Sequence, residues 1–84
     1  MTEPATLLRL DTVVALRGRS RAQNYVDIRQ GTMTPPVRLG AKLSAWPASE
    51  IDALIRAEIS GASREDLQSL VRKLVDARKK GAPA

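Results

Sequence analysis

The 84-residue sequence contains no cysteine, no histidine and no phenylalanine, and Tyr25 and Trp46 are its only aromatic residues. Without cysteine and histidine, disulfide bonds, the usual zinc sites and histidine-based catalysis are excluded. The serine, lysine and acidic residues fall in no catalytic spacing, so the sequence predicts neither an enzyme nor a bound cofactor or metal ion. A chain of this length buries only a modest core, and its stability must come from a few well-packed helices, a partner subunit, or both.

Long apolar runs are also missing. No uncharged apolar stretch approaches the length of a membrane span, and the N-terminus lacks the basic-then-apolar order of a signal peptide. The absence of cysteine fits an intracellular chain. The sequence therefore predicts a soluble, cytoplasmic protein that does not bind a membrane.

Positive charge is present in excess, and its distribution is uneven. Residues 17–42 contain six basic residues and a single acidic residue, Asp27, whereas the rest of the chain has equal numbers of both. One contiguous stretch therefore carries the whole formal net charge of +5. This pattern is typical of a small domain that meets a polyanion, and nucleic acid is the first partner that it indicates.

Two short helices are predicted on either side of a tight turn. Asp11 stands in the N-cap position of a first helix over residues 12–16, and Ser20 stands in the N-cap position of a second helix over residues 21–30. Gly18 ends the first helix. Because so few residues separate the two helices, they must meet at a sharp angle, which is the plan of a helix-turn-helix.

The second helix, which Gly31 should end, has a thin apolar side and many hydrogen-bonding groups. Tyr25 and Ile28 form its best pair for the core. Arg, Gln and Asn side chains can make bidentate contacts with guanine or adenine edges, and the first turns carry Arg21, Gln23 and Asn24. An ordinary solvated helix surface would use the same residue types, but the concentration of positive charge favours base contacts.

A β-hairpin is predicted after the second helix, with strands over residues 37–39 and 43–45. A two-residue turn would mix apolar and polar side chains on each face of the hairpin. A three-residue loop over residues 40–42 instead pairs Val37 with Ala45, which keeps apolar side chains on one face. We prefer the three-residue loop.

In that register Arg38 and Ser44 point outward and Lys42 lies in the loop. The hairpin then forms a small wing with a basic tip and a basic outer face.

Trp46 and Pro47 end the hairpin and begin a third helix, because proline is favoured at the first helical position. Trp46 is predicted to be the central core residue. Gly61 should end the helix, and its predicted core-facing stripe consists of Ile51, Leu54, Ile55 and Ile59.

A fourth helix is predicted from Ser63, which has Asp66 in the spacing of a capping box. Its apolar side consists of Leu67, Leu70, Val71, Leu74 and Val75. This stripe either covers the small core of its own chain or forms a homodimer through residues 63–80.

Three segments together carry a family resemblance. They read Gly18-x-Ser20-Arg21-x-x-x-Tyr25-x-x-Ile28-x-x-Gly31, then Pro36-Val37-Arg38-Leu39-Gly40, then Ala45-Trp46-x-x-Ser49-Glu50-Ile51-x-x-x-Ile55. In this combined spacing, over roughly residues 8–60, the chain resembles the AlpA family of phage and prophage regulators. It departs from the usual family pattern at Asn24 and Asp27, where apolar residues are more common, and at Met33-Thr34, which replaces an aromatic-proline pair.

The resemblance implies a mainly α-helical fold with a small β-hairpin wing, a MerR-like or excisionase-like winged helix-turn-helix. The C-terminal helix over residues 63–80 lies outside the matched region and is predicted from its own apolar stripe. The resemblance also implies binding to double-stranded DNA, as a transcriptional regulator or as an excisionase that directs a phage-type integrase. The chain then divides into a flexible arm over residues 1–6, the DNA-binding domain over residues 7–60, and an amphipathic helix and tail over residues 61–84.

The predicted DNA contacts come from two parts of this domain. Those of the recognition helix are Ser20, Arg21, Gln23, Asn24, Tyr25 and Arg29. Those of the turn and the wing are Arg17, Arg19, Arg38, Lys42 and Ser44.

The sequence favours two other kinds of partner less than DNA. An interaction adaptor could dock its basic stretch on an acidic protein, but an acidic protein surface does not require base-reading side chains such as Arg21 and Gln23. Sequence-specific RNA binding usually relies on stacking aromatic residues, and this chain has two aromatic residues in all.

Overall fold

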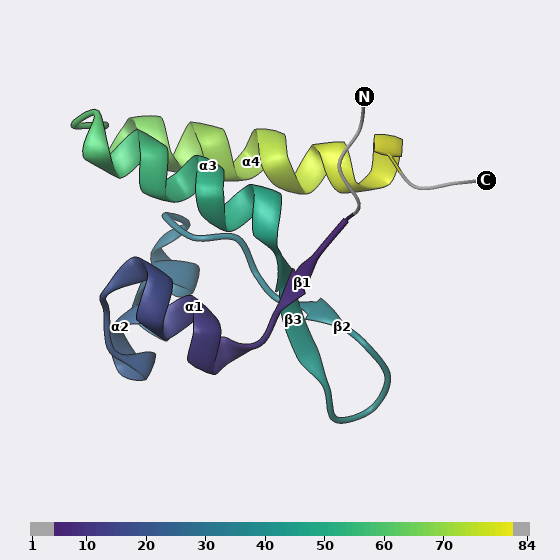
Figure 1. Ribbon diagram of the computed structural model, residues 1–84. Helices are drawn as coiled ribbons and strands as arrows, with labels where there is room; N and C mark the ends of the chain where they lie inside the picture. The colour runs from purple at the N-terminus through teal and green to yellow at the C-terminus, as the bar shows by residue number, and fades with distance from the viewer. Residues whose placement is uncertain (1–4, 82–84) are drawn as a thin grey trace.

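Residues 5–81, the part of the chain that the computed structural model describes, are mainly helical with a small antiparallel sheet, in agreement with the prediction. In chain order the elements are β1 (Leu7–Leu8), α1 (Leu10–Arg17), α2 (Arg21–Gln30), β2 (Val37–Arg38), β3 (Ser44–Pro47), α3 (Ala48–Ile59) and α4 (Arg64–Gly81). Helices α3 and α4 lie side by side along one side of the molecule, α1 and α2 lie on the other side, and the β2–β3 hairpin projects away from α4 (Figure 1). Residues 1–4 of the predicted arm and 82–84 of the predicted tail lie outside the described residues.

Helix α1 begins earlier than the sequence predicts. Its N-cap is Arg9, and Asp11 lies inside the first turn, so the prediction that Asp11 caps the helix is wrong. Leu8 of β1 and Leu10, the first residue of α1, both pack against the core. In the first turn the negative charge of Asp11 still interacts favourably with the positive end of the helix dipole. Gly18 ends α1 as predicted, with a φ of 68° that favours glycine.

Helix α2 has the predicted bounds and the predicted caps. The hydroxyl of Ser20 accepts a hydrogen bond from the backbone N–H of Gln23, and Gly31 ends the helix. Its core-facing side, however, differs from the prediction. Tyr25 is exposed, Ile28 alone of the predicted pair packs against the core, and the fully inward positions are Asn24 and Asp27.

Strand β3 lies at the centre of a three-stranded antiparallel sheet in the order β1-β3-β2. Val37 pairs with Ala45, and the N–H of Leu39 donates to the carbonyl of Leu43 at 2.8 Å, so the predicted register and three-residue loop are confirmed. The sequence analysis missed β1, because a two-residue strand is too short to show alternation. Strand β1 pairs with the end of β3 and ties the start of the chain to the hairpin.

Trp46 is a buried core residue, as predicted, and it is the largest of the fully buried side chains among the described residues. It is 1% exposed, and its indole N–H donates to the backbone carbonyl of Thr34 at 2.9 Å. The other buried members of the core cluster are Val13 of α1, Met33 of the loop between α2 and β2, Ile51 and Leu54 of α3, and Val71 of α4. Ile59, predicted for this core, is 81% exposed because it lies at the last residue of α3, beyond the part of the helix that faces the core.

Helix α4 covers this core within its own chain, which is the first of the two predicted alternatives. Ser63 and Asp66 form the predicted capping box through two backbone-to-side-chain hydrogen bonds of 3.1 Å. Near the other end, Arg78 donates to both carboxylate oxygens of the buried Glu50 and to the carbonyl of Pro35. The partly buried residues that pack against the core include Leu67, Leu70, Leu74 and Val75 of this helix. No helix in residues 5–81 combines the length and the apolar composition needed to cross a membrane.

The burial of Trp46 yields a stability prediction. Trp46→Ala should lower the free energy of unfolding by about 3–5 kcal/mol, because a large side chain is removed from a small core and leaves a cavity. This loss approaches the whole stability of a small domain. Thermal and urea unfolding followed by circular dichroism measure it.

Ile59→Ala is the matched control, since it removes an apolar side chain that is exposed, and it should change the unfolding free energy by less than about 0.5 kcal/mol. If Trp46→Ala unfolded at the wild-type temperature, the assignment of Trp46 to the centre of the core would be wrong.

Candidate nucleic-acid interface

The basic residues of the α1–α2 turn lie in an ion-pair cluster between three helices. We call Arg17, Arg19, Asn24, Asp27 and Glu58 the turn cluster. The side chain of Arg17 is 1% exposed and forms ion pairs of 3.2 Å with Asp27 of α2 and with Glu58 of α3. Arg19 is half-buried and pairs with the same two carboxylates. The cluster therefore joins the end of α1, the middle of α2 and the end of α3.

Asp27 remains a carboxylate in this cluster. Burial raises its pKa, but hydrogen bonds from Gln23 and Arg19 and the charges of Arg19 and Arg17 outweigh burial, and the net pKa lies below its ordinary value of 3.8. Gln23 contributes through its side-chain amide, which donates to Asp27 at 2.9 Å.

Asn24 serves the same cluster. It is fully buried, accepts a hydrogen bond from Arg17 at 2.6 Å, and donates to the backbone carbonyls of Arg19 and Ser20. Its amide therefore binds the turn. The sequence analysis proposed Asn24 and Arg17 as DNA contacts, and the structure places both side chains in the interior. Because their hydrogen-bonding groups are directed at the turn cluster, we remove these two residues from the candidate interface.

The outer side of α2 carries the remaining candidates from this helix. Arg21, Tyr25 and Arg29 are exposed and recur every four residues, so they lie along one stripe of the helix. Arg21 donates to the carboxylate of Asp11 at 2.8 Å, and this hydrogen bond and the charge of Asp11 raise the pKa of Arg21. Gln23 is exposed, beside this stripe.

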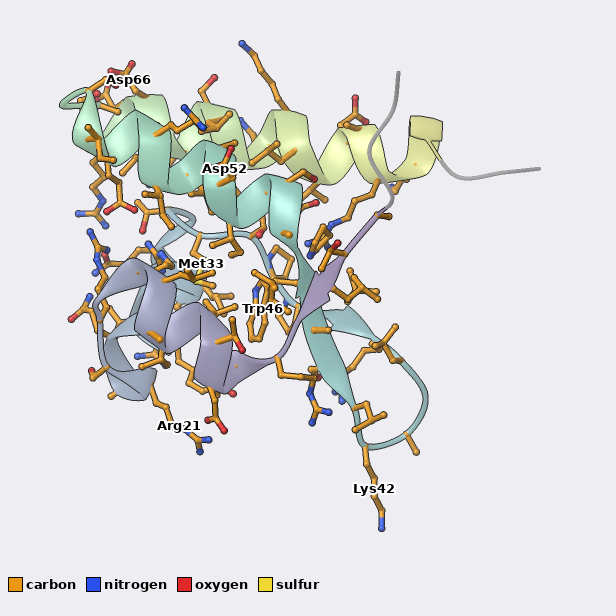
Figure 2. All side chains as sticks on the ribbon, viewed as in Figure 1. Arg21, Met33, Lys42, Trp46, Asp52 and Asp66 are labelled. Carbon is orange, nitrogen blue, oxygen red and sulfur yellow. The ribbon has the colours of Figure 1, made fainter. Side chains whose placement is uncertain are left out.

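The hairpin contributes a second exposed basic group. Arg38 and Lys42 are exposed, and Ser44 lies half-buried opposite Arg38. Figure 2 shows Arg21 and Lys42 extending from the same edge of the molecule, away from α4, whereas Asp52 and Asp66 lie on the side of α3 and α4. We call the stripe Arg21, Tyr25 and Arg29, together with Arg38 and Lys42, the basic surface.

Sequence reasoning missed two residues that decide this arrangement. Glu58 neutralises the turn cluster from 39 and 41 positions away in the chain, and Asp11 holds Arg21. An acidic residue near the end of the third predicted helix had no feature that would link it to Arg17. The sequence predicts Asp11 as a helix cap, and this role does not link it to Arg21 across the turn.

This fold and this surface define a small, mainly helical basic protein whose antiparallel sheet is compatible with a wing-type DNA-binding fold. Residues 6–59, more than half of the chain, match the family described as prophage CP4-57 regulatory protein (AlpA), and the chain belongs to this family. The predicted resemblance is thereby confirmed.

A relative comes from a phage. The chain is 42% identical over 57 residues to the uncharacterized protein ORF88 of Enterobacteria phage P4. The match covers 68% of this chain and 65% of the relative, which is slightly less than two thirds of the relative's length. No solved structure matches the chain.

The turn cluster yields a prediction on stability and its pH dependence. Asp27→Asn should lower the free energy of unfolding at neutral pH by about 2–3 kcal/mol, because the buried Arg17 loses one of its two carboxylate partners. The pKa of Asp27 is lowered in the folded state, so its stabilisation is present above the ordinary value of 3.8 and is lost as the pH falls through the folded-state value. The wild-type protein should therefore lose stability below about pH 4 more steeply than Asp27→Asn.

Urea unfolding between pH 2.5 and 7 measures this difference, with Asp52→Asn as the control. Asp52 also pairs with an arginine, but both side chains are exposed, so its loss should cost at most about 0.5 kcal/mol. Equal effects of the two variants would mean that the turn cluster adds no more than a surface ion pair.

Proposed function

We propose that this protein binds double-stranded DNA sequence-specifically and acts as a phage-type transcriptional regulator. In this proposal α1, the turn and α2 form a helix-turn-helix, and the β2–β3 hairpin forms its wing. One observation carries it: Arg21 of α2 and Lys42 of the hairpin, both exposed cations, extend from one edge of the molecule (Figure 2). Family membership supports the same reading.

Helix α2 is the proposed recognition helix. The major groove of B-DNA is wide enough for an α-helix, and the N-terminal residues of a recognition helix reach the base edges. In α2 these residues are Ser20 as the N-cap, Arg21, and Gln23. We assign base contacts to Arg21 and to Gln23, which is exposed and keeps its amide oxygen and one N–H beyond the hydrogen bond to Asp27. We assign a phosphate contact to Ser20 and backbone contacts to Tyr25 and Arg29 further along the helix.

The hairpin is proposed to bind the phosphate backbone beside this groove. Arg38 and Lys42 offer exposed charges, and the hydroxyl of Ser44 lies beside Arg38 on the same face. Arg17 acts indirectly, since the turn cluster fixes how α2 projects from α1. The partly exposed Arg19 belongs to the same cluster, and its two ion pairs give it the same indirect role.

A second role uses the same surface. An excisionase that directs a phage-type integrase also binds duplex DNA, and family membership is compatible with either role. Pull-down of genomic fragments followed by sequencing separates the two, because a regulator should recover promoter-proximal sites and an excisionase should recover attachment sites. An adaptor for acidic proteins would enrich neither class of site.

Arg21 is expected to contribute specificity. Arg21→Ala should weaken binding to a duplex selected from random sequence by about 1–3 kcal/mol, and should change binding to a scrambled duplex much less, because the variant cannot form the bidentate hydrogen bonds to a base. Competition binding at fixed salt measures both affinities.

Arg56→Ala is the matched control, because Arg56 is likewise an exposed arginine bonded to an aspartate at 2.8 Å, and it lies on α3. It should leave the discrimination between the two duplexes unchanged. Equal losses on both duplexes for Arg21→Ala would make Arg21 a phosphate contact, and no loss on either would favour the adaptor.

The wing is expected to contribute affinity without specificity. The double variant Arg38→Ala/Lys42→Ala should weaken binding to selected and scrambled duplexes alike. It should also flatten the plot of log affinity against log salt by about 0.9 for each phosphate that the variant no longer neutralises. Titrations at several salt concentrations give this slope.

Arg72→Ala/Lys73→Ala removes the same charge from exposed positions on α4 and is expected to change the slope much less. If both double variants gave the wild-type slope, the hairpin would lie outside the interface.

A further inference from the structure

A carboxylate lies inside the basic surface, next to the proposed base-reading arginine. Asp11 is in the first turn of α1, Arg21 is the first residue of α2, and the two side chains meet across the turn at 2.8 Å. Both are largely exposed, Asp11 at 86% and Arg21 at 66% of their side-chain surface. An exposed pair of this kind adds little to folding stability.

We propose that Asp11 is a specificity-determining residue that positions Arg21 for one base and discourages its contact with phosphate. This inference rests on the proposed function. It adds a residue that sequence reasoning assigned only to helix capping, and it gives that residue a role in the choice of DNA sequence.

Asp11 restricts the geometry of the Arg21 guanidinium. A guanidinium has five N–H groups in one plane, and a bidentate contact with guanine requires two of them in a fixed orientation. The hydrogen bond to Asp11 uses one N–H of the terminal nitrogen Nη2. The second N–H of Nη2 can still act together with an N–H of Nη1 or Nε, and these are the donor pairs that form a fork. Asp11 therefore restricts the long side chain while it leaves donors available for a base edge.

Asp11 also changes the electrostatic attraction between Arg21 and DNA. Every phosphate of the duplex attracts a free arginine, and this attraction is the same for all sequences. A carboxylate beside Arg21 offsets part of that attraction and repels a nearby phosphate. A base edge that accepts two hydrogen bonds from the oriented guanidinium offsets this loss of attraction. A phosphate that Arg21 reaches only by reorienting its side chain does not. Asp11 should therefore weaken non-specific binding more than binding to the selected site.

The test compares Asp11→Ala with Asp52→Ala. Both remove one exposed aspartate that accepts a single 2.8 Å hydrogen bond from an arginine, and both raise the net charge by one, but Asp52 lies on α3, away from Arg21 (Figure 2). The probes are a duplex selected from random sequence with the wild-type protein and a scrambled duplex of the same length. Circular dichroism checks folding, and Asp11→Asn replaces Asp11→Ala if the alanine variant does not fold.

We expect Asp11→Ala to bind the scrambled duplex more tightly, with a salt dependence steeper by about 0.9 if Arg21 then neutralises one further phosphate. The ratio of selected to scrambled affinity should fall by about 3- to 10-fold, part of the discrimination that one bidentate pair supplies. Asp52→Ala should leave this ratio within about twofold of the wild type, since no base contact is altered. In an Arg21→Ala background, Asp11→Ala should leave the ratio unchanged, because the residue through which it acts is missing.

Three results would overturn the inference. A wild-type protein that discriminates between the duplexes, with equal ratios for Asp11→Ala and Asp52→Ala, rejects the role of Asp11 and leaves the proposed function standing. A loss of discrimination that persists in the Arg21→Ala background means that Asp11 does not act through Arg21. A wild-type protein that binds both duplexes equally rejects the proposed function, and the role of Asp11 with it.

Discussion

The structure depends on the burial of one guanidinium. Removing a charged group from water costs several kcal/mol, so Arg17 requires partners wherever it is buried. Asp27, Glu58 and the amide of Asn24 supply them, and each comes from a helix other than α1. If any partner moved away, the cost of removing Arg17 from water would no longer be offset. The turn cluster therefore holds α1, α2 and α3 in one arrangement. A core of a few apolar side chains specifies such angles less sharply than directed hydrogen bonds do.

The burial of Arg17 separates the basic residues of positions 17–42 into those that pair within the turn cluster and those that lie on the surface. Of the six basic residues in positions 17–42, Arg17 and Arg19 pair within the turn cluster. Arg21 is held by Asp11, while Arg29, Arg38 and Lys42 lie exposed with no ion pair recorded among residues 5–81. The net charge of +5 is therefore an incomplete guide to the surface that a polyanion meets. In the proposed interface the buried cations position the recognition helix, and the exposed ones contact DNA.

Helix α4 shows that the segment shared with the AlpA family does not contain the whole core. The family match ends at residue 59, yet Val71 is part of the buried cluster and Arg78 neutralises the buried Glu50. A carboxylate that is 4% exposed needs such a partner. Residues beyond the family match thus cover one side of the domain and supply the partner of its buried carboxylate, while Arg21 and Lys42 of the basic surface extend from the edge away from them (Figure 2).

Local chemistry determined much of this protein from the sequence alone. Gly18 marks the end of α1, Ser20 and Gly31 mark both ends of α2, and the Ser63–Asp66 pair marks the start of α4. Strand alternation sets the register of Val37 against Ala45. Each of these signals acts over a few residues and can be read without knowing the rest of the fold. The sequence shows Asn24 and Asp27 as departures from the family pattern, but it does not show that both contact the buried Arg17. Only the tertiary structure decided which arginines are buried, that Tyr25 is exposed, and that Asp11 and Glu58 complete charge pairs. The free energy of a charge depends on the burial and the partners that distant segments provide, and periodicity along the chain carries no record of them.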